Sequence, residues 1–157
     1  MAVYSIKTVQ KIPASLAGVW DFFSDHANLQ RITAEHMKLQ VISKHHGSTL
    51  YAGQVIEYKL RPILGIPLYW MTEITHVEYQ KFFVDEQRYG PYSMWHHQHL
   101  FTAIPGGVEM TDIIHYKNPL WFLGDLANML FVKKQLENIF RYREMKIEEI
   151  FGRWNGA

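Results

Sequence analysis

The stretch FFVDEQRYGPYSMWHHQHLFTAIPGGVEMTDIIHYK, residues 82–117, contains three runs rich in aromatic and β-branched residues. The runs are separated by Gly90-Pro91 and by Pro105-Gly106-Gly107. Runs of this composition between turn residues are typical of β-strands, and such short connections join antiparallel neighbours. We therefore predict three consecutive antiparallel strands, at Phe82–Tyr89, Ser93–Ile104 and Val108–Lys117.

The turns also predict which side chains face one another. A turn at Pro105-Gly106 gives four facing pairs on one face of the sheet: Phe101 with Met110, His99 with Asp112, His97 with Ile114 and Trp95 with Tyr116. The turn before it sets Asp85 opposite His97, Phe83 opposite His99 and Gln87 opposite Trp95. This face is mostly aromatic and aliphatic, so we predict that it points into the interior. A register shifted by one residue would turn the whole set outward.

The patterns outside this stretch predict the remaining elements. Alternation between two faces predicts strands at Val3–Ile12, Met37–Lys44, Gln54–Leu60 and Leu68–Val77. Helical spacing predicts a short helix from Pro13, another at Asn28–Ile32, and a long helix from Asn118-Pro119 to about Phe151. Together these elements predict an α+β fold, in which a curved antiparallel sheet of seven strands wraps around a long C-terminal helix, with two short helices after the first strand.

Arg143 stands on the apolar stripe of the long helix, four residues after Ile139 and four before Ile147. A buried guanidinium without a partner would cost several kcal/mol, so we predict an ion pair with Asp85 or Asp112. The alternative is that the Arg143 side chain passes the edge of the sheet and ends in solvent.

The composition limits the class of protein and its surroundings. The 157 residues are enough for one domain. A net charge of +1 provides no basic surface for nucleic acid, and the absence of cysteine excludes disulfides and thiolate metal sites. The start shows no signal-peptide pattern, and the longest apolar run, Leu120–Val132, is too short to span a membrane. We expect a soluble cytoplasmic protein, either a monomer or a homodimer.

The segments FFVDEQRYGPYSMWHHQHLF, MTDIIHY and IFRYR resemble the ligand-binding branch of the START-like (SRPBCC) superfamily, which also contains the birch-pollen allergen and polyketide cyclase/dehydrase-type proteins. In the order of its elements the resemblance covers essentially the whole chain. It implies one START-like domain over residues 1–157, with a helix-grip fold around a hydrophobic cavity. Members of the superfamily include lipid carriers, hormone and polyketide binders, and a minority of cyclases and hydratases. They share no catalytic residue set.

We therefore expect the chain to bind, and as a carrier to transport, a small hydrophobic molecule such as a lipid or polyketide, without a cofactor. The strand at residues 68–77 adds side chains to the same concave face as the histidines. The candidate ligand-binding residues are Trp70, Thr72, Asp85, Gln87, Trp95, His97, His99, Phe101, Met110, Asp112, Tyr116 and Arg143. The plainer alternative is a self-contained polar network that only holds the strand register, around a small or collapsed cavity.

Two other interpretations use the same histidines. In a cyclase or dehydratase, His97 or His99 beside Asp112 would act as general base, while Arg143 or Tyr116 stabilises an oxyanion. A histidine pair with a facing carboxylate also has the ligand types of a zinc or iron site, but a neighbouring Arg143 charge disfavours a cation. We expect no metal.

The segment Arg61–Trp70 places Ile63, Leu64 and Ile66 between prolines in a predicted loop. Packing over the end of the helix is the simpler explanation. The alternative is a lid at the mouth of the cavity, or a transient contact with a membrane or partner, together with Tyr92 and Trp121.

Overall fold

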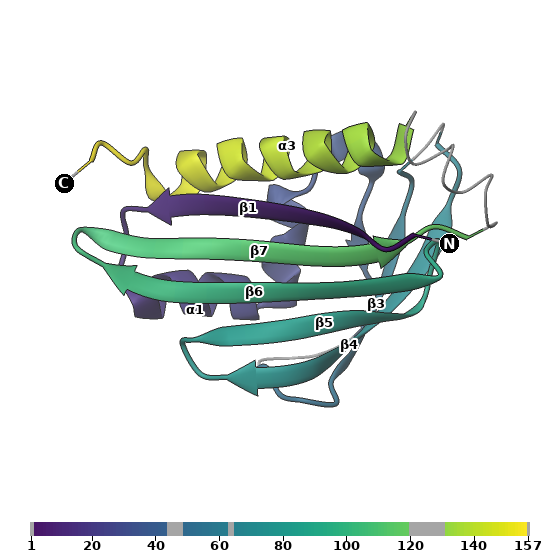
Figure 1. Ribbon diagram of the computed structural model, residues 1–157, viewed down its shortest axis with the longest axis horizontal. Helices are drawn as coiled ribbons and strands as arrows, with labels where there is room; N and C mark the ends of the chain where they lie inside the picture. The colour runs from purple at the N-terminus through teal and green to yellow at the C-terminus, as the bar shows by residue number, and fades with distance from the viewer. Residues whose placement is uncertain (1, 44–48, 63–64, 120–130, 157) are drawn as a thin grey trace.

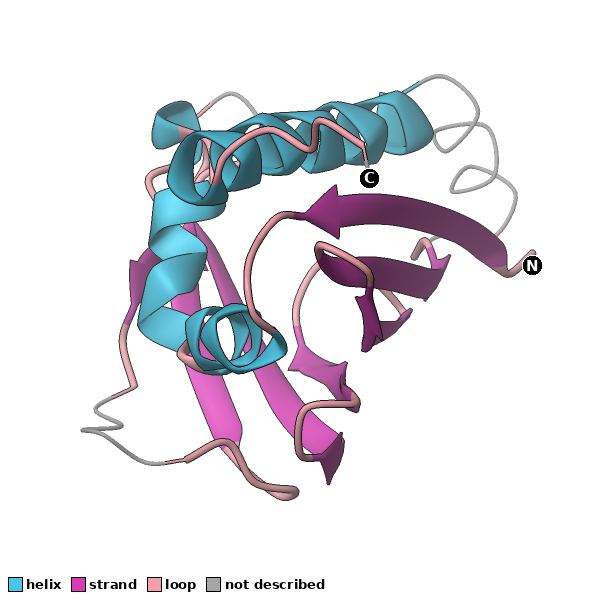
Figure 2. Ribbon diagram, turned by 90° about the vertical axis from the view of Figure 1, so that its left-hand side faces the viewer, coloured by secondary structure: helices cyan, strands magenta, loops and turns pink. Residues whose placement is uncertain are grey.

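The computed structural model describes residues 2–43, 49–62, 65–119 and 131–156. The fold is α+β: a curved, seven-stranded antiparallel sheet in the order β1-β7-β6-β5-β4-β3-β2 lies against a long C-terminal helix (Figure 1). Figure 2 shows the helices gathered on the concave side of this sheet. The predicted fold class is therefore confirmed.

The bounds of the elements agree closely with the prediction. The strands are β1 (Tyr4–Ile12), β2 (Gln40–Val41), β3 (Val55–Leu60), β4 (Leu68–Glu78), β5 (Phe82–Tyr89), β6 (Met94–Ile104) and β7 (Gly107–Lys117). The helices are α1 (Leu16–Ser24), the 3-10 helices η1 (His26–Ile32) and η2 (Glu35–Met37), and α3 (Lys133–Phe151). The long helix was predicted to start at Asn118-Pro119, but these two residues are described and are not helical; residues 120–130 lie outside the described residues, and α3 ends where predicted.

One predicted strand is largely wrong. Residues 37–44 were expected to be extended, but Met37 closes η2 and only Gln40 and Val41 pair with β3. Lys38 has a left-handed backbone with φ of 45°, which interrupts an extended run. Met37 and Leu39 are nevertheless both buried, so the alternating apolar pattern that predicted a strand reflects burial rather than sheet pairing.

The hairpin between β6 and β7 turns at Pro105-Gly106, as predicted, with Gly106 at φ of 83°. The next residue, Gly107, lies against the end of β1. A Cβ at position 107 would stand 2.1 Å from the carbonyl oxygen of Ile12. Only glycine therefore allows β1 to approach the hairpin this closely.

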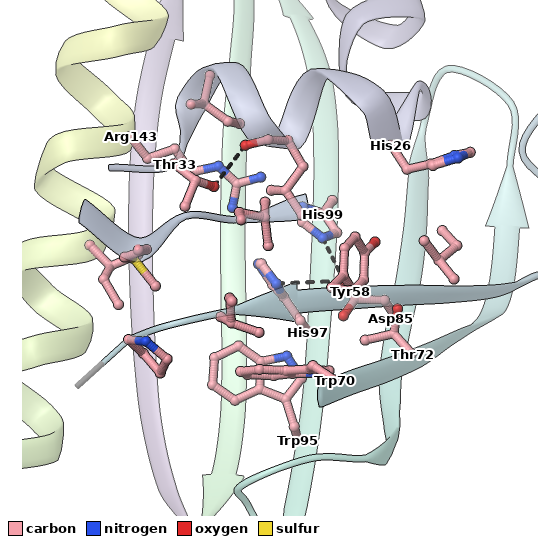
Figure 3. Close-up of a pocket in the computed structure, with 18 of the residues that line it drawn as sticks. His26, Thr33, Tyr58, Trp70, Thr72, Asp85, Trp95, His97, His99 and Arg143 are labelled. Atoms are coloured by element: carbon pink, nitrogen blue, oxygen red, sulfur yellow. Dashed lines mark hydrogen bonds and ion pairs between the residues drawn. The ribbon is translucent and has the colours of Figure 1, made fainter. Parts of the chain in front are cut away.

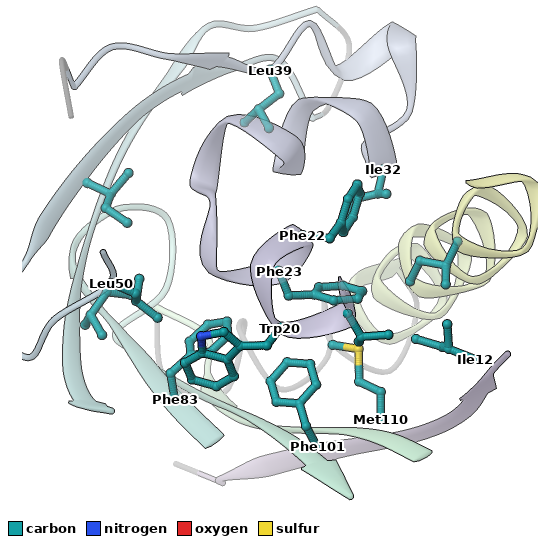
Figure 4. Close-up of a cluster of buried hydrophobic side chains, with 14 of the residues drawn as sticks. Ile12, Trp20, Phe22, Phe23, Ile32, Leu39, Leu50, Phe83, Phe101 and Met110 are labelled. Carbon is teal, nitrogen blue, oxygen red and sulfur yellow. The ribbon is translucent and has the colours of Figure 1, made fainter. Parts of the chain in front are cut away.

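Aromatic side chains fill one end of the space between sheet and helices. Trp20 and Phe23 of α1 pack on Phe101 of β6, with ring centroids 5.5 and 5.8 Å apart, and Trp20 also meets Phe83 of β5 (Figure 4). The Ser15 hydroxyl accepts a hydrogen bond from the Gly18 amide and caps α1. Side chains therefore fill this end, and the cavity described next lies beyond them.

Candidate functional site

A cavity of about 450 Å³ lies between α3, the concave face of the sheet and the short helices (Figure 3). Apolar and aromatic side chains from α1, η1, β3, β4 and α3 form most of its wall. The polar side chains include Tyr58, Thr72, Asp85, His97, His99 and Arg143. The cavity is therefore mostly apolar, with these polar groups on the sheet and α3 and further polar side chains between Ser24 and Thr33.

The structure places seven of the twelve predicted ligand-binding residues on the wall of this cavity: Trp70, Thr72, Asp85, Trp95, His97, His99 and Arg143. Phe101, Met110, Asp112 and Tyr116 are buried on the same face of the sheet but do not line the cavity. Gln87 does not line it either, because its amide is engaged by the hairpin turn: Nε2 donates to the Tyr92 carbonyl at 2.6 Å. Contact of any of the twelve with a ligand stays a prediction.

The predicted register is confirmed around the histidines. His97 faces Ile114 and His99 faces Asp112 across β6 and β7, while Asp85 faces His97 across β5 and β6. The predicted pairing of Gln87 with Trp95 is absent, because the described β5–β6 ladder ends at Glu86 and His96 as the chain opens into its turn.

Three buried side chains and one that is half-buried form what we call the histidine–aspartate cluster: His97, His99 and Asp112, with Asp85. His97 Nε2 lies 2.9 Å from Asp112 Oδ1, and His99 Nε2 lies 2.8 Å from Asp85 Oδ2. His99 Nδ1 is also 2.8 Å from Asp112 Oδ1, but its orientation is poor for a hydrogen bond, so this contact is electrostatic. His97 Nδ1 and Asp85 Oδ2 are 3.6 Å apart. Each carboxylate therefore contacts both imidazole rings.

Burial and charge set the protonation states in the cluster. Burial lowers the pKa of His97, and the charge of His99 lowers it further, which favours a neutral imidazole. Burial acts in the same direction on His99, but its close contacts with Asp112 and Asp85 and their charges raise its pKa overall. Burial alone would raise the pKa of Asp112, yet the charge of Arg143 and the contacts with both histidines hold that pKa well below its usual range.

The predicted ion pair of Arg143 is wrong. No carboxylate among the described residues lies within 4.0 Å of its guanidinium, and its Nε atom is buried without a hydrogen-bond partner. The guanidinium instead stands over the rings of Phe23 and Phe140, 5.8 and 5.7 Å from their centres. Its charge reaches Asp85 and Asp112 only at longer range, and the side chain lines the cavity rather than passing to solvent.

Most of the wall was not among the predicted site residues, and Tyr58 and Phe22 show why. Tyr58 of β3 is buried beside the cluster, where burial first and the charge of Asp85 second raise the pKa of its hydroxyl. It alternates with Ile56 and Leu60 on the predicted strand, so this pattern already pointed to a shared face. Phe22 of α1 also lines the cavity, which no local pattern indicates because it depends on how α1 docks.

The same cluster contains potential metal ligands. One atom each from Asp85, His97 and His99 can be chosen so that all three lie within 4.8 Å of one another. These three residues line the cavity, whereas Asp112 lies behind them.

Comparison with solved structures identifies the architecture. Protein CV1439 from Chromobacterium violaceum superposes with a TM-score of 0.74 at 8% identity, covering 96% of this chain and 99% of that one. A START superfamily protein from Mycobacterium smegmatis gives a TM-score of 0.65 at 13% identity, over 93% and 98% of the two chains. The chain has the START-like helix-grip fold. Ginseng major latex-like protein 151 from Panax ginseng shares this fold, with a TM-score of 0.68 at 12% identity over 95% and 97% of the chains.

No protein-family model and no curated protein matches the sequence. The fold of this START-like chain is therefore evident from its three-dimensional structure and from the resemblance of its motifs. In the part of the chain that the structure describes, every helix is too short or too polar to cross a membrane.

Proposed function

We propose that this START-like chain, acting as a single domain, binds a small hydrophobic molecule with one polar end. The observation that carries the proposal is the cavity of about 450 Å³, whose wall is mostly apolar and includes the polar cluster residues Asp85, His97 and His99. Small-molecule sites typically have volumes of about 300–1,000 Å³, with apolar walls that supply contact area and a few polar groups that orient the ligand.

Two unsatisfied donors support a ligand with a hydrogen-bond acceptor at its polar end. Arg143 Nε and Trp70 Nε1 are both buried without a hydrogen-bond partner, and both side chains line the cavity. A buried donor that lacks an acceptor is costly, and a carboxylate or carbonyl on the ligand would relieve that cost. Fatty acids and the carbonyl groups of polyketides both have this chemistry.

A cavity-filling variant provides the test. Ile56 of β3 lines the cavity, whereas the preceding residue, Val55, is on the opposite face and partly exposed. We expect the fluorescent fatty acid cis-parinaric acid to bind the unmodified chain. Ile56→Trp should weaken that binding at least tenfold because the indole occupies ligand space, and Val55→Trp should leave it unchanged. Circular dichroism would establish that both variants are folded.

Equal affinity of parinaric acid for Ile56→Trp and the unmodified chain would place the probe outside the cavity and contradict the proposal. The proposal would also be contradicted if the chain bound neither parinaric acid nor its methyl ester, and if native mass spectrometry detected no co-purifying small molecule.

Transport between membranes is the finer part of the proposal. Ile66 and Phe131 are 59% and 71% exposed, and Gln135 of α3 donates to the Pro62 carbonyl at 2.9 Å, so the loop before β4 adjoins the start of α3. Pro62 and Gln135 both line the cavity, which supports a mouth beside these two exposed side chains. A carrier would present such a rim to a bilayer, and vesicle flotation of Ile66→Ser would show reduced association. A cytoplasmic location belongs to the same proposal.

Catalysis by His97 or His99 stays a prediction. A general base must reach the proton that it removes, and that distance depends on the position of the bound molecule.

A further inference from the structure

One ring nitrogen of His97 and one of His99 lie close to the same oxygen of Asp85. His99 Nε2 and His97 Nδ1 lie 2.8 and 3.6 Å from Asp85 Oδ2. In a tetrahedral zinc site with bonds of about 2.0–2.2 Å, neighbouring ligand atoms are about 3.3–3.6 Å apart. One of these two separations is shorter than that spacing and the other lies at its upper end, and ligand atoms chosen from the three residues all lie within 4.8 Å of one another.

The other ring nitrogen of each histidine lies close to Asp112. Its Oδ1 atom lies 2.9 Å from His97 Nε2 and 2.8 Å from His99 Nδ1. Histidines that bind metals commonly direct their second ring nitrogen to a carboxylate, which sets the tautomer and the orientation of the ring. Asp112 does this for His97 through a hydrogen bond, and its charge lies beside His99 Nδ1 without one.

We propose that Asp85 Oδ2, His97 Nδ1 and His99 Nε2 bind one divalent transition metal ion, of the zinc or ferrous iron class, with Asp112 as the carboxylate that orients His97 and lies beside His99. Two histidines and one carboxylate are a ligand set that both of these ions accept. Because the three ligand side chains line the cavity, the remaining coordination positions would face the bound molecule.

The Arg143 charge is the feature that opposes a cation here. It has no ion pair within 4.0 Å among the described residues, and it acts on Asp85 and Asp112 from a longer distance. Two carboxylates with neutral histidines carry a charge of −2, which balances the ion and leaves the single positive charge of Arg143. An anionic end on the cavity's ligand would neutralise that charge. The metal proposal itself does not depend on the hydrophobic ligand.

Cobalt titration of the full chain tests the site directly. The protein is purified without an affinity tag, stripped with a chelator and titrated with Co²⁺, whose visible absorbance reports nitrogen and oxygen ligation. We expect one equivalent to bind and Zn²⁺ to displace it. His97→Ala and His99→Ala should weaken binding at least a hundredfold, and Asp112→Asn about tenfold to a hundredfold, the usual effect of removing a carboxylate that orients a ligand.

The matched controls are His96→Ala and His115→Ala. These histidines face each other on the outer side of the same two strands, where His96 contacts Glu86. Both variants should bind Co²⁺ as the unmodified chain does. If either control loses the ion, or if the variant lacking both His97 and His99 keeps it, the ion occupies a surface site and the proposal fails.

Histidine spectra of the unmodified protein remove any dependence on how well the variants fold. With ¹⁵N-labelled histidine, Zn²⁺ should shift His97 Nδ1 and His99 Nε2 and leave the nitrogens of His115 unchanged. No saturation at millimolar Co²⁺, or Zn²⁺ shifts confined to other histidines, would overturn the site. Parinaric acid binding is measured on the same stripped protein. Its result shows whether the proposed ligand binding also fails or whether only the metal site is absent.

Discussion

Arg143 shows how a half-buried charge can be stable without an ion pair. Its guanidinium lies over Phe23 and Phe140, so the aromatic faces replace part of the lost hydration. Asp85 and Asp112 attract it from more than 4.0 Å, but they are already engaged by the histidines. The N–H of its Nε therefore remains available for an acceptor, which the proposed ligand would supply.

Replacing this side chain should affect acids and esters differently. A hydrogen bond to a charged group contributes about 1.5–3 kcal/mol, and about 1.4 kcal/mol corresponds to a tenfold change in affinity. We expect Arg143→Met to weaken cis-parinaric acid about tenfold to a hundredfold and its methyl ester much less. Fluorescence titration measures both. Arg141→Met is the control, because Arg141 is exposed on α3. Equal losses for acid and ester would mean that Arg143 contributes only packing.

At the scale of elements, the hairpins were predictable and the helix contacts were not. Strand alternation and the Pro105-Gly106 turn are local, so they bring His99 opposite Asp112 without knowledge of the rest of the chain. The position of the Arg143 side chain depends on how α3 crosses the sheet, and the contribution of Phe22 depends on how α1 docks. Residue spacing along the sequence does not reveal how either helix packs on the sheet. An apparent ion pair was therefore predicted where a cation–π contact exists.

The close packing of β1 against the β6–β7 hairpin requires a residue without a side chain at position 107. A methyl group there would meet the Ile12 carbonyl oxygen at 2.1 Å and the Trp154 ring at 2.9 Å, and the backbone oxygen cannot move without displacing β1. We expect Gly107→Ala to lower the free energy of unfolding in urea by about 1–3 kcal/mol.

Gly18→Ala is the comparison for that measurement. Gly18 lies in α1, where alanine is a better helix former by about 1 kcal/mol, and the new methyl would meet only the movable Ser15 hydroxyl at 3.2 Å. Its stability should stay close to that of the unmodified chain. An unchanged midpoint and slope for Gly107→Ala would show that β1 can shift without cost.

At the scale of the whole molecule, the cavity is expensive to keep empty. Core voids cost about 24 cal/mol per Å³, which for a closed void of 450 Å³ would be about 11 kcal/mol. Folded proteins are stable by only about 5–15 kcal/mol in total. A chamber of this size is therefore sustained by the surrounding sheet and helices together with whatever molecules fill it, solvent or ligand.

Filling the chamber with its proposed kind of occupant should stabilise the entire fold. A ligand that binds only the folded chain, at a free concentration of about a hundred times its Kd, adds about 2.7 kcal/mol. For a chain of this size each kcal/mol raises Tm by about 2–4 °C, so cis-parinaric acid at that concentration should raise Tm by about 5–11 °C. Differential scanning calorimetry measures the shift. Ile56→Trp, in which an indole already occupies part of the chamber, should show little or none at the same concentration. An equal rise in both proteins would place the fatty acid elsewhere on the surface, and a fall in Tm would mean that it prefers the unfolded chain.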